Sequence, residues 1–298
     1  MATTRSQEQT APLPRARPRR GLHPFVFIAP ALILLLLLLV VPIAQALRSS
    51  LMVGDQLSFD NYVRVFTRDS LARRAFGHTL IFSAVSTIGQ YLIGLGIALI
   101  VNAPLPAPGM LRLAFLVPWM FPAVIPGIVW RWMLDGQFGI INELLRKAGL
   151  IEAYVAWLGM PNTALSAVTV ANIWRGFPLM MVLLLAGLQA IPQDIHEAAA
   201  VDGANSWQRL WRITLPLMAR VSFVALLLSW MGNFMNFAIV RVMTDGGPAN
   251  SSEVLATLIF KNAFTYMDMN YAAALGIVLL FFLMIPGGAY VRATLRER

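Results

Sequence analysis

Long apolar segments alternate with shorter polar ones along most of the chain. A membrane span needs about 20 mainly apolar residues, because a helix rises about 1.5 Å per residue through about 30 Å of hydrocarbon. The segments lack the period-two alternation of a barrel strand, and helices satisfy their own backbone groups in lipid. The pattern therefore predicts an all-α polytopic membrane protein with six spans. The predicted spans are residues 25–47, 79–101, 111–133, 164–189, 221–240 and 272–291.

The first predicted span lies close to the start of the chain and resembles a signal peptide in one respect. Ala44 and Ala46 form the small-residue pattern of a signal peptidase site. The apolar run before them is longer than the roughly 7–15 residues of a signal peptide's hydrophobic region, so we interpret it as an uncleaved anchor. Residues 1–24 are rich in Arg, Pro, Ser, Thr and Gln, which is typical of a disordered tail. Residues 25–298 then form one membrane domain.

In the third span, prolines are placed where they can change the path of the helix. Pro118, Pro122 and Pro126 each lack a backbone N–H and free a carbonyl one turn earlier. We therefore expect bends in this span.

Composition strengthens the membrane interpretation. Of the 298 residues, 58% are hydrophobic and 12% are charged, whereas a soluble domain has about 45–50% apolar and about 25% charged residues. The net charge of +9 could indicate nucleic acid, but the basic residues gather beside apolar segments, which is typical of membrane orientation. An even number of spans puts both termini on one side. The basic cluster at residues 15–20 predicts that this side, with the tail, is cytoplasmic.

Several kinds of chemistry are excluded by the residues that they would need. Lys147 and Lys261 lie in no glycine-rich phosphate loop, so the chain is not its own P-loop ATPase. The three histidines are scattered, and His196-Glu197 lacks the second histidine of the zinc motif H-E-x-x-H. The chain has no cysteine. We expect no catalytic residue, no metal site and no cofactor bound by this chain.

A secondary transporter or a channel-like protein independent of an ATPase is the alternative class. Ion-coupled transport needs buried carboxylates inside the membrane. No Asp or Glu lies within any of the six predicted spans. The sequence therefore disfavours ion coupling, and the alternative stays open on the pattern of residues alone.

The polar loop between the fourth and fifth spans, residues 191–216, has the pattern of two short helices. Glu197 complements the positive end of the first helix, and Gly203 supplies the left-handed residue that ends it. Ser206 is placed to cap the second helix, and Pro216 to end it. The two helices form either an amphipathic hairpin on lipid headgroups or an element that docks another protein.

This loop also matches a known motif. In order along the chain it holds Glu-Ala-Ala, Asp-Gly-Ala and Ile-x-Leu-Pro, which resembles the EAA loop of binding-protein-dependent ABC importer permeases. In that family the loop is a coupling helix seated in a groove of the ATPase subunit. Leu210 stands in place of the usual aromatic residue. The residues that the resemblance implies in ATPase coupling are Glu197, Ala198, Ala199, Asp202, Gly203, Ala204, Ile213, Leu215 and Pro216.

Other segments resemble the sugar-type branch of that family, which includes importers of maltose and glycerol 3-phosphate. Three of them are residues 118–119 (PW), 173–175 (IWR) and 244–248 (TDGGP). The resemblance runs from about residue 25 to the end of the chain. It implies six transmembrane helices of the ABC importer permease type, a cytoplasmic coupling helix, and a place in the bacterial cytoplasmic (inner) membrane.

The resemblance also implies the function and the partners. The chain is expected to be a non-catalytic permease subunit that forms, with a second homologous permease, the pathway for a sugar or sugar-like solute, such as an oligosaccharide or a glycerol phosphate. Two ATP-binding-cassette subunits would use ATP and magnesium. An extracytoplasmic solute-binding protein would deliver the solute.

Polar residues inside the spans are candidates for the solute pathway. An ionisable group at the centre of a span costs at least about 2.5–3.5 kcal/mol, so it faces a partner or an aqueous cavity. Arg175, one turn after Asn172, either lines the pathway or binds backbone carbonyls or the partner subunit. In the fifth span, polar residues at helical spacing lie beside an aromatic face, which suits either sugar binding or helix packing. The predicted pathway residues are Asn172, Arg175, Ser229, Trp230, Asn233, Asn236 and Phe237.

Overall fold

The computed structural model describes residues 24–103 and 108–296. The chain divides into two units, Met1–Gln45 and Ala46–Arg298, and each is described by itself. The predicted disordered tail lies almost wholly outside the described residues, which begin at Pro24. Its boundary with the membrane domain stays a prediction.

The first unit holds most of α1 (Pro24–Ser50). Its sequence is rich in leucine, which has a high helix propensity. Pro30 and Pro42 lie inside the helix without ending it. Residues Ile28–Ser50 are long and apolar enough to cross a membrane, in agreement with the predicted first span.

Three helices of the second unit are also long and apolar enough to cross a membrane. They are α3 (Ser70–Asn102), α7 (Pro161–Gln189) and α14 (Met269–Arg296). These helices confirm that the segments of the predicted second, fourth and sixth spans are helical. They exceed the predicted apolar runs because a helix can continue through polar residues once it has left the hydrocarbon.

The predicted third span is not one straight helix. α4 (Pro108–Met120) and α5 (Val124–Met133) form a pair bent by 92°. The break contains Pro122, which has no N–H with which to continue α4. The expected bend is therefore present, and it is sharp enough to separate two helices. Residues 111–133 form either one broken span or a re-entrant loop.

The predicted fifth span ends earlier than expected. α11 (Ala219–Phe234) is followed by a separate short helix, α12 (Ala238–Met243). The chain leaves the helix where Asn236 Nδ2 donates a hydrogen bond to Asn172 Oδ1 of α7 at 2.9 Å. The prediction that one helix continues to residue 240 is therefore wrong.

Short elements connect the long helices. The segment Ser206–Leu217, in which η2 is a π-helical turn, is bent by 69° against α11. Among the described residues, four helices are long and apolar enough to cross a membrane, and the number rises to six if each bent pair counts as one span. Helix length alone therefore does not determine whether the protein has six spans. The short elements are β1 (Met52–Val53), β2 (Gln56–Leu57), α2 (Asp60–Val63), η1 (Arg64–Arg68), α6 (Ile140–Lys147), α8 (Gln193–Val201), α9 (Ser206–Arg209), η2 (Leu210–Thr214), α10 (Leu215–Leu217), α13 (Leu255–Phe260) and η3 (Lys261–Thr265).

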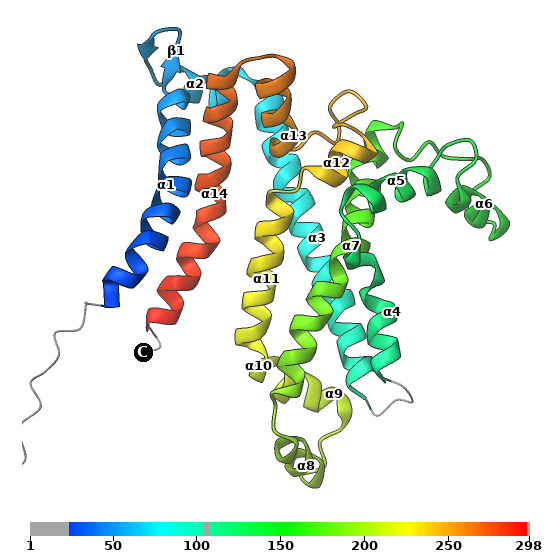
Figure 1. Ribbon diagram of the computed structural model, residues 1–298. Helices are drawn as coiled ribbons and strands as arrows, with labels where there is room; N and C mark the ends of the chain where they lie inside the picture. Colours follow the sequence, from blue (N-terminus) through cyan, green and yellow to red (C-terminus); the bar gives the residue numbers. More distant parts are fainter. Residues whose placement is uncertain (1–23, 104–107, 297–298) are drawn as a thin grey trace, which may run out of the picture. The chain divides into compact units, whose positions relative to one another are not determined.

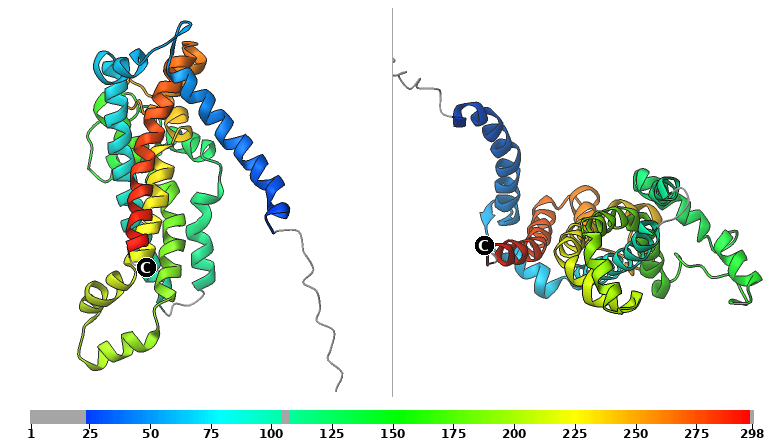
Figure 2. Two further views of the ribbon diagram at one scale, coloured as in Figure 1. Left: turned by 90° about the vertical axis from the view of Figure 1, so that its left-hand side faces the viewer. Right: turned by 90° about the horizontal axis from the view of Figure 1, so that it is seen from below.

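In the second unit, α3 and α7 lie side by side, and α11 and α4 pack beside them (Figure 1 and Figure 2). A Cβ atom at Gly94 of α3 would lie 2.9 Å from the backbone nitrogen of Met181 of α7. Glycine permits this close approach of two membrane helices. Helices α8 and α9 lie at one end of the bundle, and α5, α6, α12 and α13 lie at the other (Figure 1).

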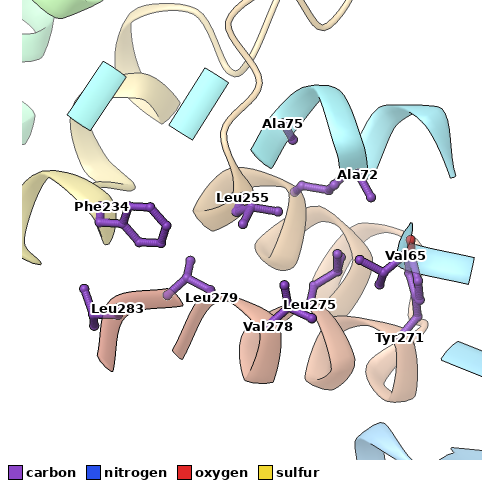
Figure 3. Packing of buried hydrophobic residues seen from close by; sticks show 11 residues of the cluster. Val65, Ala72, Ala75, Phe234, Leu255, Tyr271, Leu275, Val278, Leu279 and Leu283 are labelled. Carbon is purple, nitrogen blue, oxygen red and sulfur yellow. The ribbon is translucent and has the colours of Figure 1, made fainter. Parts of the chain in front are cut away.

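A buried apolar cluster joins α14 to α3, α11 and α13 (Figure 3). Along α14, Tyr271, Leu275 and Val278 recur at spacings of three and four residues, so they share one face. Phe234 of α11 and Leu255 of α13 pack against this face. The cluster holds α14 against the bundle.

Asp69 caps α3 and links it to α14. Its Oδ1 accepts hydrogen bonds from the backbone N–H groups of Leu71 (2.8 Å) and Ala72 (3.0 Å), and its Oδ2 accepts one from the Tyr271 hydroxyl (2.7 Å). Partial burial raises the pKa of Asp69, but these hydrogen bonds and the charge of Arg64 outweigh it, so the pKa lies below its usual value of 3.8. The ionised carboxylate is the form that the fold stabilises.

We expect Asp69→Ala to lower the free energy of unfolding by about 1 kcal/mol at pH 7, because an N-cap is lost. A carboxylate whose pKa is depressed on folding stabilises the protein above its unfolded pKa, and this contribution is lost as the pH falls through the folded pKa. The difference in thermal unfolding midpoint between wild type and variant should therefore shrink below about pH 4. Asp60→Ala, at the surface ion pair with Arg68 (2.8 Å), is the control. If the difference in unfolding midpoint between wild type and Asp69→Ala does not change with pH, this account is wrong.

Candidate functional site

The predicted coupling loop forms a two-helix projection at one end of the second unit (Figure 1). Its first helix, α8, begins directly after Pro192 and ends at Val201, with Asp202 as the C-cap residue, and Gly203 follows with a φ of +80°. This left-handed backbone confirms the prediction that Gly203 ends the helix. A Cβ atom at Gly203 would meet no described heavy atom within 4 Å. Glycine is therefore required here by backbone conformation and not by lack of space.

The second helix of the projection has a different cap from the predicted one. Asn205 Oδ1 accepts a hydrogen bond from the backbone N–H of Gln208, and Gln208 Oε1 accepts one from the backbone N–H of Asn205, both at 2.9 Å. This reciprocal capping box satisfies two backbone donors, where a single cap satisfies one. The prediction of Ser206 as the cap is therefore wrong by one residue. Pro216 lies in α10, which ends at the next residue, as predicted.

The first helix presents the motif residues unevenly. Glu197 and Ala198 are exposed, whereas Ala199 is buried. Glu197 Oε1 accepts a hydrogen bond from Gln193 Nε2, one turn earlier, at 2.7 Å. Val201 is 88% exposed on the same short helix. Residues four apart share a helix face, so Glu197 and Val201 lie beside each other on an exposed face of α8.

The remaining motif residues also differ in exposure. Asp202 and Pro216 are exposed, and Ala204, Ile213 and Leu215 are half-buried. The role of all these residues in ATPase coupling stays a prediction.

A cavity of about 140 Å³ lies among α3, α4, α7 and α11. Its lining combines amide, hydroxyl and apolar groups with one guanidinium, that of Arg175. Arg175 Nε is buried and has no hydrogen-bond partner among the described residues. The predicted pathway residues that line this cavity are Asn172, Arg175, Ser229, Asn233 and Asn236.

Hydrogen bonds between side chains join α3, α7 and α11 at this cavity. Asn233 Nδ2 of α11 donates to Thr87 Oγ1 (3.0 Å) and Gln90 Oε1 (3.1 Å) of α3. Asn172 Nδ2 of α7 donates to Asn233 Oδ1 at 2.8 Å, and Ser229 Oγ donates to Gln90 Oε1 at 2.6 Å. A network of neutral groups that satisfy one another avoids the cost of unpaired polar groups in lipid.

Two predicted pathway residues are not among those that line the cavity. Trp230 packs against the α14 cluster and stacks on Phe234, with ring centroids 5.7 Å apart. It follows Ser229 directly, so it lies on a different side of α11. Phe237 lies beyond the end of α11 and packs against Phe260, with centroids 5.0 Å apart. Both contacts are those of helix packing, and a role in the pathway stays a prediction for both residues.

Helix α3 contributes polar residues that were not predicted. Ser83, Ser86, Thr87 and Gln90 are all buried. They recur at spacings of three and four residues, so they form one polar stripe along an otherwise apolar helix. This spacing is present in the sequence and is the signal that identifies them.

A buried ion pair lies at the opposite end of the second unit, in the connection between α12 and η3. Glu253 is fully buried, and Lys261 Nζ lies 2.5 Å from its Oε2. Lys261 Nζ also donates to Asp245 O at 2.7 Å. Glu253 Oε1 has no hydrogen-bond partner in the described part of the chain. Nowhere within residues 24–103 and 108–296 do three His, Asp or Glu side chains form a group that could hold a metal ion.

Comparison with known proteins gives a family match over residues 90–293, to the binding-protein-dependent transport system inner membrane component. The chain is 32% identical to the sulfoquinovosyl glycerol transport system permease protein SmoG of Agrobacterium fabrum, over 90% of this chain and 88% of that protein. It is 38% identical to the trehalose/maltose transport system permease protein MalF of Thermococcus litoralis, over 73% of this chain and 72% of that protein.

The fold is similar to that of a chain in the crystal structure of a bacterial ABC transporter involved in the import of the acidic polysaccharide alginate. The TM-score is 0.76 at 23% sequence identity, over 90% of this chain and 94% of that chain. A second structure, of the alginate transporter in complex with an alginate pentasaccharide-bound periplasmic protein, gives a TM-score of 0.75 over 91% of this chain.

Proposed function

Because this chain belongs to the family of binding-protein-dependent transport system inner membrane components, we propose that it forms, with a second homologous permease, the pathway for a sugar or sugar-like solute. The chain is a multi-pass inner-membrane permease subunit of an ABC importer, and the role of its family is transport. The sugar class is supported by relatives named for the transport of sulfoquinovosyl glycerol and of trehalose or maltose.

The observation that carries this proposal is the polar lining of the cavity among α3, α4, α7 and α11. Amide and hydroxyl groups both donate and accept hydrogen bonds, as the hydroxyl groups of a sugar require. Arg175 adds donors for a solute oxygen. No carboxylate is among the described residues that line the cavity, and an ion-coupled secondary transporter would need one.

The remaining tasks belong to partner proteins. Two ATP-binding-cassette subunits would use ATP and magnesium, and one of them would hold the projection of residues 191–216 in its groove. This arrangement places α8 and both termini in the cytoplasm. An extracytoplasmic binding protein would deliver the solute to the opposite face. The exposed Glu197 and the left-handed Gly203 support a docking role for the projection.

We expect Asn236→Ala to lower solute uptake by about fivefold to tenfold, the equivalent of one hydrogen bond of about 1–1.5 kcal/mol. Asn236 faces the cavity and donates to Asn172. Arg175→Ala should lower uptake by a similar factor, while basal ATPase activity stays unchanged in both variants. Uptake into proteoliposomes that contain the whole importer measures the effect.

Asn262→Ala is the matched control for the loss of a buried amide. Asn262 is buried in η3 and donates to Leu258 O at 2.9 Å, and it does not line the cavity. Its variant should transport normally. Unchanged uptake in both Asn236→Ala and Arg175→Ala would show that other residues line the pathway. Uptake driven by an ion gradient without ATP would instead refute the importer function itself.

A further inference from the structure

A second, apolar groove runs between α3, α4, α5 and α7. Its volume of about 700 Å³ is typical of pockets that bind small ligands. The lining side chains are apolar except for the indole nitrogens of Trp130 and Trp174. The groove therefore suits a hydrocarbon ligand.

The groove and the polar cavity use different faces of α7. Ile173, Trp174 and Phe177 line the groove, whereas Asn172 and Arg175 line the cavity. Residues that are four apart share a helix face, and residues two apart lie on nearly opposite faces. A solute with many hydroxyl groups would find no matching partners in the groove, so its ligand differs from that of the cavity.

The groove follows the membrane helices for a substantial distance. Along α7 its lining extends from Val170 to Phe177, which is about 10 Å at 1.5 Å per residue. It reaches Ile97 on α3 and Phe115 on α4, toward the end of the bundle that carries α8 (Figure 1). These helices lie in segments expected to contact lipid.

A positive charge lies at this end of the groove. Arg112 is three residues before Phe115 on α4, and its Nη2 donates to the carbonyl oxygen of Val101, one turn beyond Ile97 on α3, at a long 3.4 Å. Arg112 Nε is buried and has no hydrogen-bond partner within the described chain. None of the ion pairs between described residues includes Arg112. No described acceptor takes the remaining hydrogens of the two Nη atoms, so these donors are free for an external anion.

We propose that this groove binds an acyl chain of an anionic phospholipid, whose phosphate contacts Arg112. Guanidinium groups form charge-assisted hydrogen bonds with phosphate oxygens. Basic pockets between membrane helices bind anionic headgroups. The apolar lining holds the chain, Arg112 selects the headgroup, and the lipid comes from the leaflet at the α8 end of the bundle.

The test uses the full-length chain with benzoylphenylalanine in place of Phe115, in nanodiscs that contain equal amounts of dioleoyl phosphatidylglycerol and dioleoyl phosphatidylcholine. After illumination, mass spectrometry gives the ratio of the two cross-linked lipids. We expect phosphatidylglycerol to be favoured by about fivefold, the effect of one basic residue on an anionic lipid. Arg112→Gln should abolish the preference, and Arg112→Lys should retain it.

Arg220→Gln is the matched control, because Arg220 is exposed at the start of α11, at the same end of the bundle and outside the groove. It should leave the preference unchanged. The proposal is overturned if the two lipids cross-link equally to the protein that carries benzoylphenylalanine at position 115 and retains Arg112. It is also overturned if Arg220→Gln removes the preference for phosphatidylglycerol. It is also overturned if position 115 cross-links to protein instead of lipid.

Discussion

Gly203→Val is expected to reduce both transport and solute-stimulated ATP hydrolysis, although the membrane helices still insert. Gly203 follows the C-cap residue of α8 and has a φ of +80°, a conformation that costs a β-branched residue about 1–3 kcal/mol. A penalty of this size corresponds to a change of about 5–150-fold in the equilibrium constant that couples the projection to the ATPase subunits. A Cβ atom there meets no described neighbour, so the loss comes from a change in backbone conformation. Reconstituted importer and pull-down of the ATPase subunits measure it.

Gly149 offers a matched control for this substitution. It has a φ of +70°, follows α6 at the opposite end of the unit, and also has open space around its Cα. Gly149→Val should impose similar local strain and leave coupling intact. Normal coupling in Gly203→Val would mean that the projection only rests on lipid headgroups.

Lys261→Met should cause the largest loss of stability. Lys261 Nζ is the ion-pair partner of the fully buried Glu253. Removing one partner of a buried pair leaves an uncompensated charge, which costs about 3–5 kcal/mol. The variant should therefore unfold at a much lower temperature in detergent, as measured by the loss of helical circular dichroism.

The only other lysine of the chain supplies the control. Lys147 Nζ lies 3.3 Å from Glu143 Oε1, but its side chain is 72% exposed. An exposed pair contributes little to stability, so Lys147→Met should unfold almost as the wild type does. The double variant Glu253→Gln/Lys261→Met should recover much of the stability that Lys261→Met loses, because residue 253 then carries no buried charge. Equal stability of Lys261→Met and the wild type would show that the Glu253–Lys261 ion pair does not stabilise the fold.

The long helices were predictable because insertion in lipid depends on the composition of each segment alone. Helices α3, α7 and α14 follow the predicted apolar runs. The end of α11 depends instead on a contact between segments, since Asn236 leaves the helix and reaches Asn172, which is 64 positions away. No local pattern contains that contact, and the predicted span therefore continued too far.

The same distinction applies to the candidate site. Asn172 was identified because it lies one helical turn before Arg175, and Asn233 because it lies at helical spacing from Ser229 and Asn236 beside an aromatic face. The polar stripe of α3 that contains Gln90 has the same kind of spacing, but its other members are small hydroxyl residues and it contains no charged group. Trp230 and Phe237 were selected for their residue type, whereas their positions depend on the aromatic rings that other segments bring beside them.

Asn233 Nδ2 has three oxygen atoms within 3.2 Å, those of Thr87, Gln90 and Ser229, yet an amide nitrogen carries only two hydrogens. One acceptor is therefore always spare. If α11 slides against α3, the Asn233 amide can release one oxygen and bind another, so neither of its N–H groups is left without a hydrogen-bond acceptor inside the membrane. We expect the two helices to exchange partners during such sliding, so the contacts that tie them together also lower the barrier to their relative motion.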